Sequence, residues 1–373
     1  MIVKTISDTE HLNYIASQSS VSFLQTPAWG VTKTPGWSYE SLGWFNNDQL
    51  VGVGLVLFRK VPKLNKFLAY LPEGPNIDWT NSHTVEAALR ALNTFAKSRN
   101  VFQLKIGPHA WTKRWNAEVL KDSIASNSAR SIGQLGPSSI NQNGLALAKQ
   151  LRDLGWKQPA AEESGFGDYQ PRYVFQLDIE NKTEDEIFEG FNQLWRRNIR
   201  KAEKEGVTVR LGHRDDLEIF HACYVETAAR DKFRPRPLSY FYAMWDAMKA
   251  EDDQRINLFI AEHPDHQGAI AATTLTQVGD HAWYSYGAST TAARDLRPSN
   301  AIQWAMIKHS LAHGATTYDM RGISDTLSSD NHLFGLIQFK LGTGGYAQEY
   351  VGEWDYNISP MLAKAFSIYM ARR

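Results

Sequence analysis

Two stretches of this chain repeat one order of elements, and that repeat limits the available folds more than any other feature. In each half, a polar turn leads into two consecutive strands, and a capped amphipathic helix and a further strand follow. The two copies are offset by roughly the same distance at every landmark. The first copy reads NNDQ, LVGVGLVLFRK, KFLAYLPEG, SHTVEAALRALNTFAKSRN and VFQLKIGP, and the second reads HPDHQ, GAIAATTLTQ, HAWYSYGAS, SNAIQWAMIKHSLAHG and TTYDMRG. The pattern predicts an α+β unit used twice.

The repeat also predicts where the chain divides. We expect a first domain over residues 1–160, a second over 161–350, and a C-terminal segment over 351–373 that can pack back on the first. Residues 121–144 are rich in Ser, Asn and Gly, which is typical of a long loop. Two unrelated domains stay an alternative from the pattern alone.

Composition excludes several classes of protein. The 373 residues are 43% hydrophobic, and 40 basic residues balance 40 acidic ones, so we expect a folded protein that does not bind DNA through a global positive field. Cys223 is the single cysteine, which excludes an internal disulfide. The eleven histidines contain no H-x-x-x-H or H-E-x-x-H pair with a third ligand nearby. Phosphate-loop and G-x-S-x-G motifs are absent as well, so we expect no metal or cofactor.

The N-terminus lacks the basic start and apolar run of a signal peptide, and no window reaches about 18 uninterrupted apolar residues. We therefore expect a cytoplasmic protein, at most peripheral at the inner face of a membrane.

A helix is predicted over 183–206, because Thr183 and Glu186 form a capping box, apolar residues recur at helical spacing and Gly206 ends the pattern. Its last turns carry a cluster of basic residues: Arg196, Arg197, Arg200, Lys201 and Lys204. Such a cluster is either a solvated face that complements the helix dipole or a surface that binds a polyanion.

Other cations lie beside proline, glycine and aromatic residues. They are Lys33 in FLQTPAWGVTKTPGW, Arg234 and Arg236 in ARDKFRPRPLSYFY, and Lys340 in FKLGTGG. Lys340 has two interpretations. It is either a strand-edge lysine with its amine in water, or a catalytic charge that projects into a site left open by the following glycines.

Seven stretches, in order across nearly the whole chain, resemble the FemABX family of peptidoglycan bridge aminoacyltransferases. They are FLQTPAWGVTK, FRKVPKLNKFLAYLPEGPNIDW, FNQLWRRNIRKAEKEGVTV, RDKFRPRPLSYF, GAIAATTL, YSYGAST and GLIQFKLGTGGYAQEYVGEWD. The resemblance implies two GNAT-like acyltransferase domains, the first binding the acceptor. It also implies transfer from aminoacyl-tRNA to the stem-peptide amine of lipid II or of the uridine-linked precursor, UDP-MurNAc-pentapeptide. The second half holds no heptad stretch of about 50 residues, so we expect no coiled-coil arm.

The resemblance also assigns roles to residues. Lys340, with Phe339 beside it, matches the family's lysine at the reaction centre, where a tetrahedral oxyanion needs a positive donor. Lys33 and Arg236 match the phosphate-contacting lysine and arginine, and Tyr240 matches a substrate-contacting tyrosine. Either Tyr286 or Tyr284 fills a second tyrosine position, and strand alternation places both on one face.

One departure concerns the general base. Many relatives carry an acidic residue before the proline in the strand that here reads LKIGP, where this chain has Gly107. That substitution argues against a carboxylate base from this position. Water or a substrate phosphate can accept the proton instead, and Asp319 and Asp325 are further candidates.

The donor site stays open between two chemistries. The turn ARDLRPSNA lacks the G-x-G or G-x-A of coenzyme A binders, whereas Arg197, Arg200 and Lys201, with Arg294 and Arg297, suit a tRNA acceptor arm. The leading hypothesis is an aminoacyl-tRNA-dependent transferase with possible peripheral membrane contact. The alternatives are an acyl-CoA N-acyltransferase of the same fold and a binding protein that keeps the precursor pocket without turnover.

Overall fold

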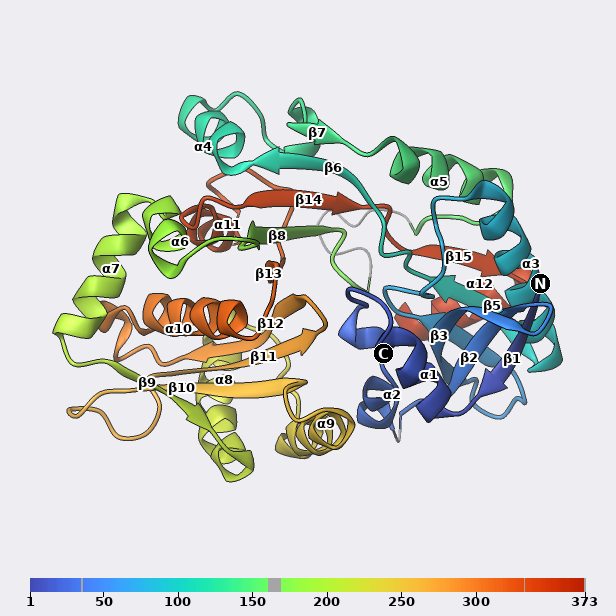
Figure 1. Ribbon diagram of the computed structural model, residues 1–373, viewed down its shortest axis with the longest axis horizontal. Coiled ribbons are helices and arrows are strands. Elements are labelled where there is room, and N and C mark those ends of the chain that lie inside the picture. Colours follow the sequence, from blue (N-terminus) through green and yellow to red (C-terminus); the bar gives the residue numbers. More distant parts are fainter. Residues whose placement is uncertain (35, 160–168, 332, 372–373) are drawn as a thin grey trace. The chain divides into compact units, whose positions relative to one another are not determined.

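The computed structural model describes residues 1–34, 36–159, 169–331 and 333–371, and the chain forms two compact units (Figure 1). Unit 1 comprises Met1–Arg114, Gly136–Tyr173 and Gln348–Arg373, and unit 2 comprises Trp115–Leu135 and Val174–Ala347. The chain passes from one unit to the other within strands β6 (Trp111–Asn116), β8 (Tyr173–Asp178) and β14 (Tyr346–Tyr350), and once more between Leu135 and Gly136.

The sheet of unit 1 has the order β1-β2-β3-β4-β5-β15. Its strands are β1 (Ile2–Ile6), β2 (Ser38–Asn46), β3 (Gln49–Lys60), β4 (Phe67–Leu71), β5 (Val101–Ile106) and β15 (Trp354–Asn357). Strands β1 to β4 pair antiparallel, whereas β4 and β5 are parallel, so the chain needs a crossover between them. Helix α3 (Ser82–Ser98) supplies it, and its N-terminal amides bond the side chain of Asn81.

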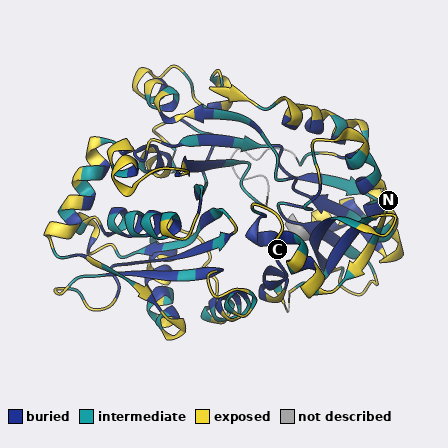
Figure 2. Ribbon diagram, in the orientation of Figure 1, coloured by how far each residue is buried: buried dark blue, intermediate teal, exposed yellow. Residues whose placement is uncertain are grey.

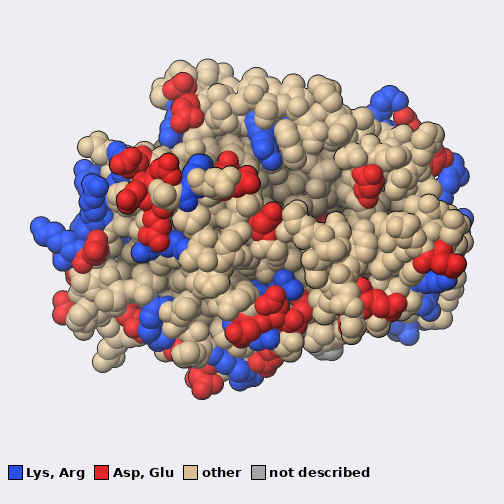
Figure 3. All heavy atoms as spheres, viewed as in Figure 1, with Lys and Arg blue, Asp and Glu red and all other residues tan. Residues whose placement is uncertain are grey.

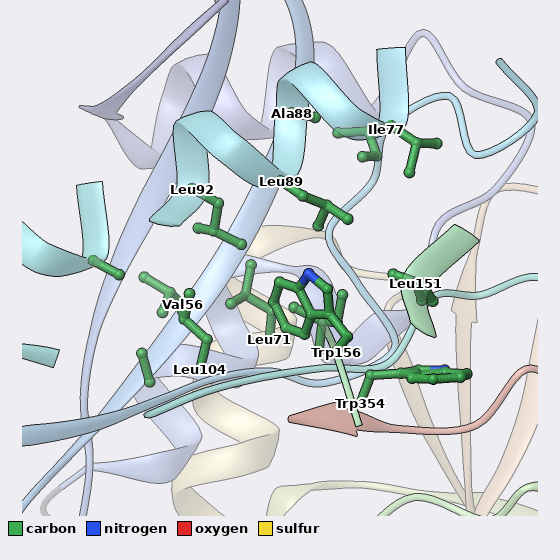
Figure 4. Close-up of a cluster of buried hydrophobic side chains, with 14 of the residues drawn as sticks. Val56, Leu71, Ile77, Ala88, Leu89, Leu92, Leu104, Leu151, Trp156 and Trp354 are labelled. Carbon is green, nitrogen blue, oxygen red and sulfur yellow. The ribbon is translucent and has the colours of Figure 1, made fainter. Parts of the chain in front are cut away.

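The other helices of unit 1 are α1 (Asp8–Ile15), α2 (Pro27–Lys33), α5 (Gln142–Asp153) and α12 (Pro360–Ala371). The apolar face of α3 packs on the sheet in a cluster that also takes Trp156 and Trp354, and Figure 4 shows both indoles among Leu71 and Leu151. A second cluster joins Ala363 and Phe366 of α12 to Leu68 and Phe102 of the sheet.

The strands of unit 2 follow the order β8-β13-β12-β11-β10-β9. They are β9 (Thr208–Gly212), β10 (Ile256–Glu262), β11 (Ala271–Val278), β12 (His281–Ser289) and β13 (Thr317–Gly322). Strand β7 (Ser139–Ile140) belongs to unit 1, where it pairs with Lys113 and Arg114 of β6. Strands β10 to β12 pair antiparallel and β12 to β13 parallel, with α10 (Pro298–Ala312) as the crossover. Figure 2 shows that the central strands of both sheets are mainly buried.

The remaining helices of unit 2 are α4 (Ala117–Ser126), α6 (Glu184–Gly190), α7 (Gln193–Lys204), α8 (Leu217–Asp231), α9 (Leu238–Glu251) and α11 (Phe334–Leu341). Short 3₁₀ turns are η1 (Phe23–Gln25), η2 (Ile132–Gln134), η3 (Arg214–Asp216) and η4 (Arg294–Leu296). Both units therefore contain the hairpin, crossover helix and parallel strand of the repeat, and the prediction of one α+β unit used twice is confirmed.

Contacts in the two units explain where the predicted domain boundaries differ from the compact units. Backbone bonds from Ile132 to Asp325 (2.7 Å) and from Leu327 to Arg130 (2.8 Å) hold residues 115–135 in unit 2. The C-terminal segment lies in unit 1, where β15 pairs with β5. The boundaries at 160 and 350 themselves stay predictions.

Two local predictions were wrong. Residues 121–144 are not one long loop, because α4 extends to Ser126 and α5 begins at Gln142. The helix predicted over 183–206 is two helices, because Phe191 adopts an extended conformation and the side chain of Asn192 caps α7 through the Trp195 amide. Asparagine competes with the helical backbone in this way, which favours a new N-terminus.

The glycines after Lys340 are required by packing and do not mark an open site. A Cβ on Gly342 would lie 2.0 Å from the Trp195 ring, and one on Gly345 would lie 2.1 Å from the Gln176 carbonyl. Gly344 has a φ of +76°, a left-handed conformation that favours glycine, and its Cβ would lie 2.7 Å from the Gly190 carbonyl. Larger residues here would push apart α11, β14 and their neighbours, so they would destabilise the fold.

Candidate active site

Strand β12 extends beyond its parallel neighbour β13, and the part of β12 beyond this pairing lines a cavity in unit 2. The two strands pair only through His281–Trp283 and Thr317–Asp319, whereas β12 continues to Ser289. The cavity beyond has a volume of about 210 Å³. Its lining comes from β11, β12, the end of α8, the start of α10 and α11, and it includes Thr273, Tyr284, Ser299, Gln303 and Phe339. Phe339 therefore borders a cavity, while Lys340 is not among its lining residues.

A bulge in β12 separates the two candidate tyrosines. Tyr284 pairs with Leu275 and Tyr286 with Thr274, so Ser285 is left over and consecutive residues of β11 oppose them. Because consecutive strand residues face opposite sides, Tyr284 and Tyr286 do too, and the expectation of one shared face was wrong.

Tyr284 faces the cavity, and its hydroxyl lies 1.7 Å from where a Cβ on Gly287 would be. Only glycine leaves room for the phenol in this position. Burial raises the pKa of Tyr284 to about 12, so the hydroxyl is protonated at neutral pH.

Tyr286 joins the arginine and tyrosine that the resemblance singled out. Its hydroxyl lies 3.0 Å from the hydroxyl of Tyr240, and it also bonds the side chain of Arg236. The Arg236 guanidinium lies over the Tyr240 ring, 4.6 Å from its centroid. A bond of 3.0 Å between the His221 ring and the Arg236 carbonyl holds the segment before α9. Three of the predicted substrate-contacting residues therefore form one cluster in unit 2.

Lys33 lies in unit 1, in the last turn of α2. Proline at the first position starts this helix, and the Lys33 amine lies 4.0 Å from the centroid of the Trp29 ring. The aromatic ring fixes the amine at the helix end. Its contact with a phosphate stays a prediction.

Lys340 is a buried helical lysine. It lies in the last turn of α11, is 3% exposed, and donates to the backbone carbonyls of Gly322 (2.7 Å) and Arg321 (3.2 Å) at the end of β13. The interpretation as a strand-edge lysine in water was therefore wrong. Burial lowers the pKa of Lys340 to about 7, with Asp319 opposing that shift and Arg321 adding to it.

Asp319 takes part in the same buried network. Its carboxylate accepts from Gln176 at 2.9 Å and lies 3.5 Å from the His281 ring. Burial raises its pKa, but the His281 bond and the Arg321 charge outweigh that effect, so the pKa is lowered. The carboxylate is thus held by structural partners within unit 2.

Trp195 links the basic helix α7 to α11, a contact that was not predicted from the sequence. Its indole N–H donates to the Phe339 carbonyl at 2.8 Å, and the two rings lie 4.7 Å apart. Gly342 packs against the same indole. A pattern of apolar spacing cannot reveal this hydrogen bond, because the partners are far apart in the sequence.

The side chains of Arg197 and Arg200 on α7 are exposed and that of Lys201 is half-buried. Basic side chains gather over α7 at the left edge of Figure 3. The Arg200 guanidinium lies 5.2 Å from the centroid of the Phe188 ring. The cluster is thus presented at the surface, and its role in binding tRNA stays a prediction.

The backbone of Glu73 and the side chain of Glu353 lie beside Gly107 in unit 1. A Cβ there would lie 3.2 Å from the Glu73 amide nitrogen and 3.6 Å from the Glu353 side chain. Glu353 is 2% exposed and accepts from the Tyr70 hydroxyl and, at 2.8 Å, from the Tyr169 amide. Glu73 lines a second cavity of about 360 Å³. The sequence analysis missed both residues, although Glu353 lies in the stretch GEWD.

Comparison with known proteins identifies the family. Residues 6–262 and 248–370 match the FemAB family. The chain belongs to that family. Relatives named Lipid II:glycine glycyltransferase include proteins from Staphylococcus epidermidis, 28% identical over 416 aligned residues, and Staphylococcus aureus, 27% identical over 421. Both alignments cover 96% of this chain and 93% of the relative.

Solved structures support the same fold for this FemAB family protein. The crystal structure of FemX matches 98% of this chain and 99% of its own, with a TM-score of 0.79 and 24% identity. A tandem GNAT protein from the clavulanic acid biosynthesis pathway covers 96% and 98% of the two chains, with a TM-score of 0.54 and 11% identity. The prediction of two GNAT-like units is confirmed. In the described part of the chain no helix exceeds the 17 residues of α3, so those residues form no coiled-coil arm.

Among the described residues, no group of three or more His, Cys, Asp or Glu side chains could hold a metal ion. Within the same residues, no helix has both the length and the apolar character needed to cross a membrane.

The buried amine makes a prediction about stability. Lys340→Met removes the donor to two carbonyls, so we expect a loss of about 1 to 3 kcal/mol in the free energy of unfolding. The unfolded chain keeps this proton up to a pH near 10.5, whereas the folded chain releases it near pH 7. The wild-type contribution is therefore smallest below pH 7, and it rises as the pH increases toward 10.5.

Urea denaturation of wild type and Lys340→Met at several pH values tests this expectation, with the exposed Lys97→Met as the matched control. Equal pH dependence in Lys340→Met and wild type would contradict it.

Proposed function

We propose that this chain transfers an amino acid from an aminoacyl-tRNA to the stem-peptide amine of a peptidoglycan precursor. The observation that carries the proposal is that relatives named as glycyltransferases acting on lipid II match 96% of the chain, and so include both units. We place the reaction at the unit 2 cavity bordered by Phe339. Lys340 follows Phe339 in α11 without lining that cavity, and its role in the reaction is proposed from the resemblance.

The acceptor carries a diphosphate, which suits fixed cations. Within unit 2 we assign Arg236 to it, since its guanidinium lies over the Tyr240 ring. A phosphate contact of Lys33 in unit 1, whose amine lies over the Trp29 ring, stays a prediction from the resemblance. Tyr240 and Tyr286 add hydroxyl donors beside Arg236. Tyr284 belongs instead to the cavity beside Phe339, where we assign it to the donor.

The chemistry then proceeds by attack of the stem-peptide amine on the ester carbonyl of the donor. A C–N bond forms, the carbonyl becomes a tetrahedral oxyanion, and the C–O bond to the tRNA ribose breaks. The amine gives up a proton and the ribose hydroxyl gains one. Water or a substrate phosphate can carry the proton.

Lys340 can stabilise the oxyanion only when it is charged. An ammonium group has three N–H bonds, and the Arg321 and Gly322 carbonyls accept two of them. The third is then left for the oxyanion. A neutral amine has two N–H bonds, and both are used by the carbonyls.

This count predicts the pH dependence of the rate. Because the pKa of Lys340 is about 7, turnover at saturating substrates should fall as the pH rises through that value. Lys340→Met should lower turnover by roughly 10²- to 10³-fold and should remove the fall in rate near pH 7. Initial rates of wild type and Lys340→Met are measured between pH 5.5 and 9, and the folding of both proteins is checked at each pH. A rate that rises through about pH 7 and loses that rise in Lys340→Met would assign the lysine a basic role instead.

The acceptor assignment gives a second prediction. Arg236→Ala should weaken precursor binding by about 1.5 to 3 kcal/mol, the range for hydrogen bonds to charged groups. Arg236→Lys should recover only part of the loss, because a point charge replaces a planar fork. Calorimetry with the uridine-linked precursor measures both, with the neighbouring exposed Arg234→Ala as control. Unchanged affinity in Arg236→Ala would remove this residue from the acceptor site.

The donor is tested in a transfer assay. The protein is incubated with lipid-linked or uridine-linked precursor, total charged tRNA and radiolabelled amino acids, and label on the precursor is measured. Ribonuclease should abolish transfer, and reversing Arg197, Arg200 and Lys201 to glutamate should raise the donor KM more than the acceptor KM. The control is a variant in which three exposed lysines, Lys97, Lys157 and Lys182, are together changed to glutamate.

The same assay includes the acyl-CoA alternative, which the fold of the tandem GNAT protein favours. Transfer from an acyl-CoA that persists with ribonuclease present would replace the tRNA proposal. Precursor binding without transfer from either donor would indicate a binding protein.

A further inference from the structure

The C-terminal helix α12 of unit 1 has an apolar face that the described chain leaves uncovered. Its inner side packs Ala363 and Phe366 against the sheet. On the outer side, Met361 is 84% exposed and Ile368 is 46% exposed. With Lys364 and Ala365 between them, these residues follow the i, i+3, i+4, i+7 spacing of one helix face. The outer face of α12 thus exposes two large apolar side chains, with Lys364 between them.

A hairpin turn lies beside this helix. Val61 and Leu362 both pack on the cluster that joins α12 to the sheet, so the β3–β4 turn and the start of α12 are neighbours. Leu64, in the turn, is 45% exposed. The helix and the turn thus present exposed apolar side chains in the same region of unit 1.

The charges of the two segments have one sign. Residues 59–71 and 358–371 contain no Asp or Glu and five basic residues, Arg59, Lys60, Lys63, Lys66 and Lys364, in a chain whose formal net charge is zero. Lys60 and Lys63 are exposed in the turn, and Lys364 is exposed on the outer face of α12. Exposed apolar residues among lysines are typical of a surface that binds an anionic membrane.

We propose that the β3–β4 turn and the outer face of α12 form a membrane-docking surface for anionic lipid. The apolar side chains enter the interface of the bilayer, and the lysines contact the lipid phosphates. The helix lies along the interface rather than across it, in agreement with the absence of a spanning helix among the described residues. This inference builds on the proposed function, because a lipid-linked acceptor resides at such a surface.

Vesicle flotation without precursor or donor tests the surface independently of transfer. The full chain should float with phosphatidylcholine vesicles that contain phosphatidylglycerol and remain unbound with phosphatidylcholine alone, and added salt should weaken binding. Replacing Lys60, Lys63 and Lys66 together by glutamine should lower the partition coefficient by about 10²-fold. Met361→Glu should also lower it, because a charge would enter the apolar interface.

Matched control variants test whether vesicle binding needs these particular residues or only the overall charge and apolar surface of the protein. Glutamine at Lys97, Lys157 and Lys182, and Leu145→Glu on α5, should leave flotation unchanged. Binding that ignores lipid charge, or that survives in both test variants, would overturn the proposal. A dimer by sedimentation that Met361→Glu dissociates would also overturn it, because a second copy of the chain would then cover this face.

Transfer assays add a second readout. The test variants should lose transfer to precursor held in anionic vesicles while keeping transfer to the soluble uridine-linked precursor. If wild type transfers to neither, the proposed function fails while flotation still decides the membrane surface.

Discussion

The buried amine of Lys340 is the contact on which the second unit's site depends. β13 stops pairing with β12 after Asp319, and the Arg321 and Gly322 carbonyls beyond that point receive their hydrogen bonds from the lysine. A buried carbonyl without a donor costs about 1 to 3 kcal/mol, so the amine stabilises the divergence of the two strands. The part of β12 beyond this pairing lines the cavity that Phe339 borders. Stability therefore favours the neutral amine of Lys340, because burial disfavours its charge, whereas the proposed stabilisation of the oxyanion requires the charged form.

Trp195 extends this coupling to the surface. Its indole bonds the Phe339 carbonyl and packs on Gly342, so α11 cannot shift without disturbing α7. The basic residues of α7 lie on the same short helix. If these residues contact a tRNA, as proposed, the Trp195 ring connects that contact to the candidate reaction centre. Coupling between α7 and the reaction centre requires that a change at one of them alters the other. The donor KM and the turnover of the α7 variant measure it.

Unit 1 differs in how it holds charge. Lys105 is buried with Asp355 at 2.8 Å and Glu353 at 3.8 Å, so its charge is compensated from the C-terminal segment. Burial lowers the pKa of Lys105, but the charges of Asp355 and Glu353 outweigh burial and raise it. The pKa of Lys340 shifts in the opposite direction because its amine bonds backbone carbonyls, whose dipoles stabilise a positive charge less than carboxylates do. The same residue type is thus a fixed cation in one unit and a titrating group in the other.

Local patterns in the sequence were sufficient for the doubled α+β unit, because hairpins, helix caps and crossover helices are encoded within a few residues of one another. The family resemblance singled out Arg236, Tyr240 and Phe339, which the structure places in a cluster or beside a cavity. Three features required the tertiary structure. The β12 bulge places Tyr284 and Tyr286 on opposite faces, since pairing with β11 decides it. The glycines after Lys340 are packing residues, because their neighbours Trp195, Gly190 and Gln176 come from distant segments. The pKa of Lys340 depends on burial by the whole unit, so no spacing of residues within the chain could have indicated it.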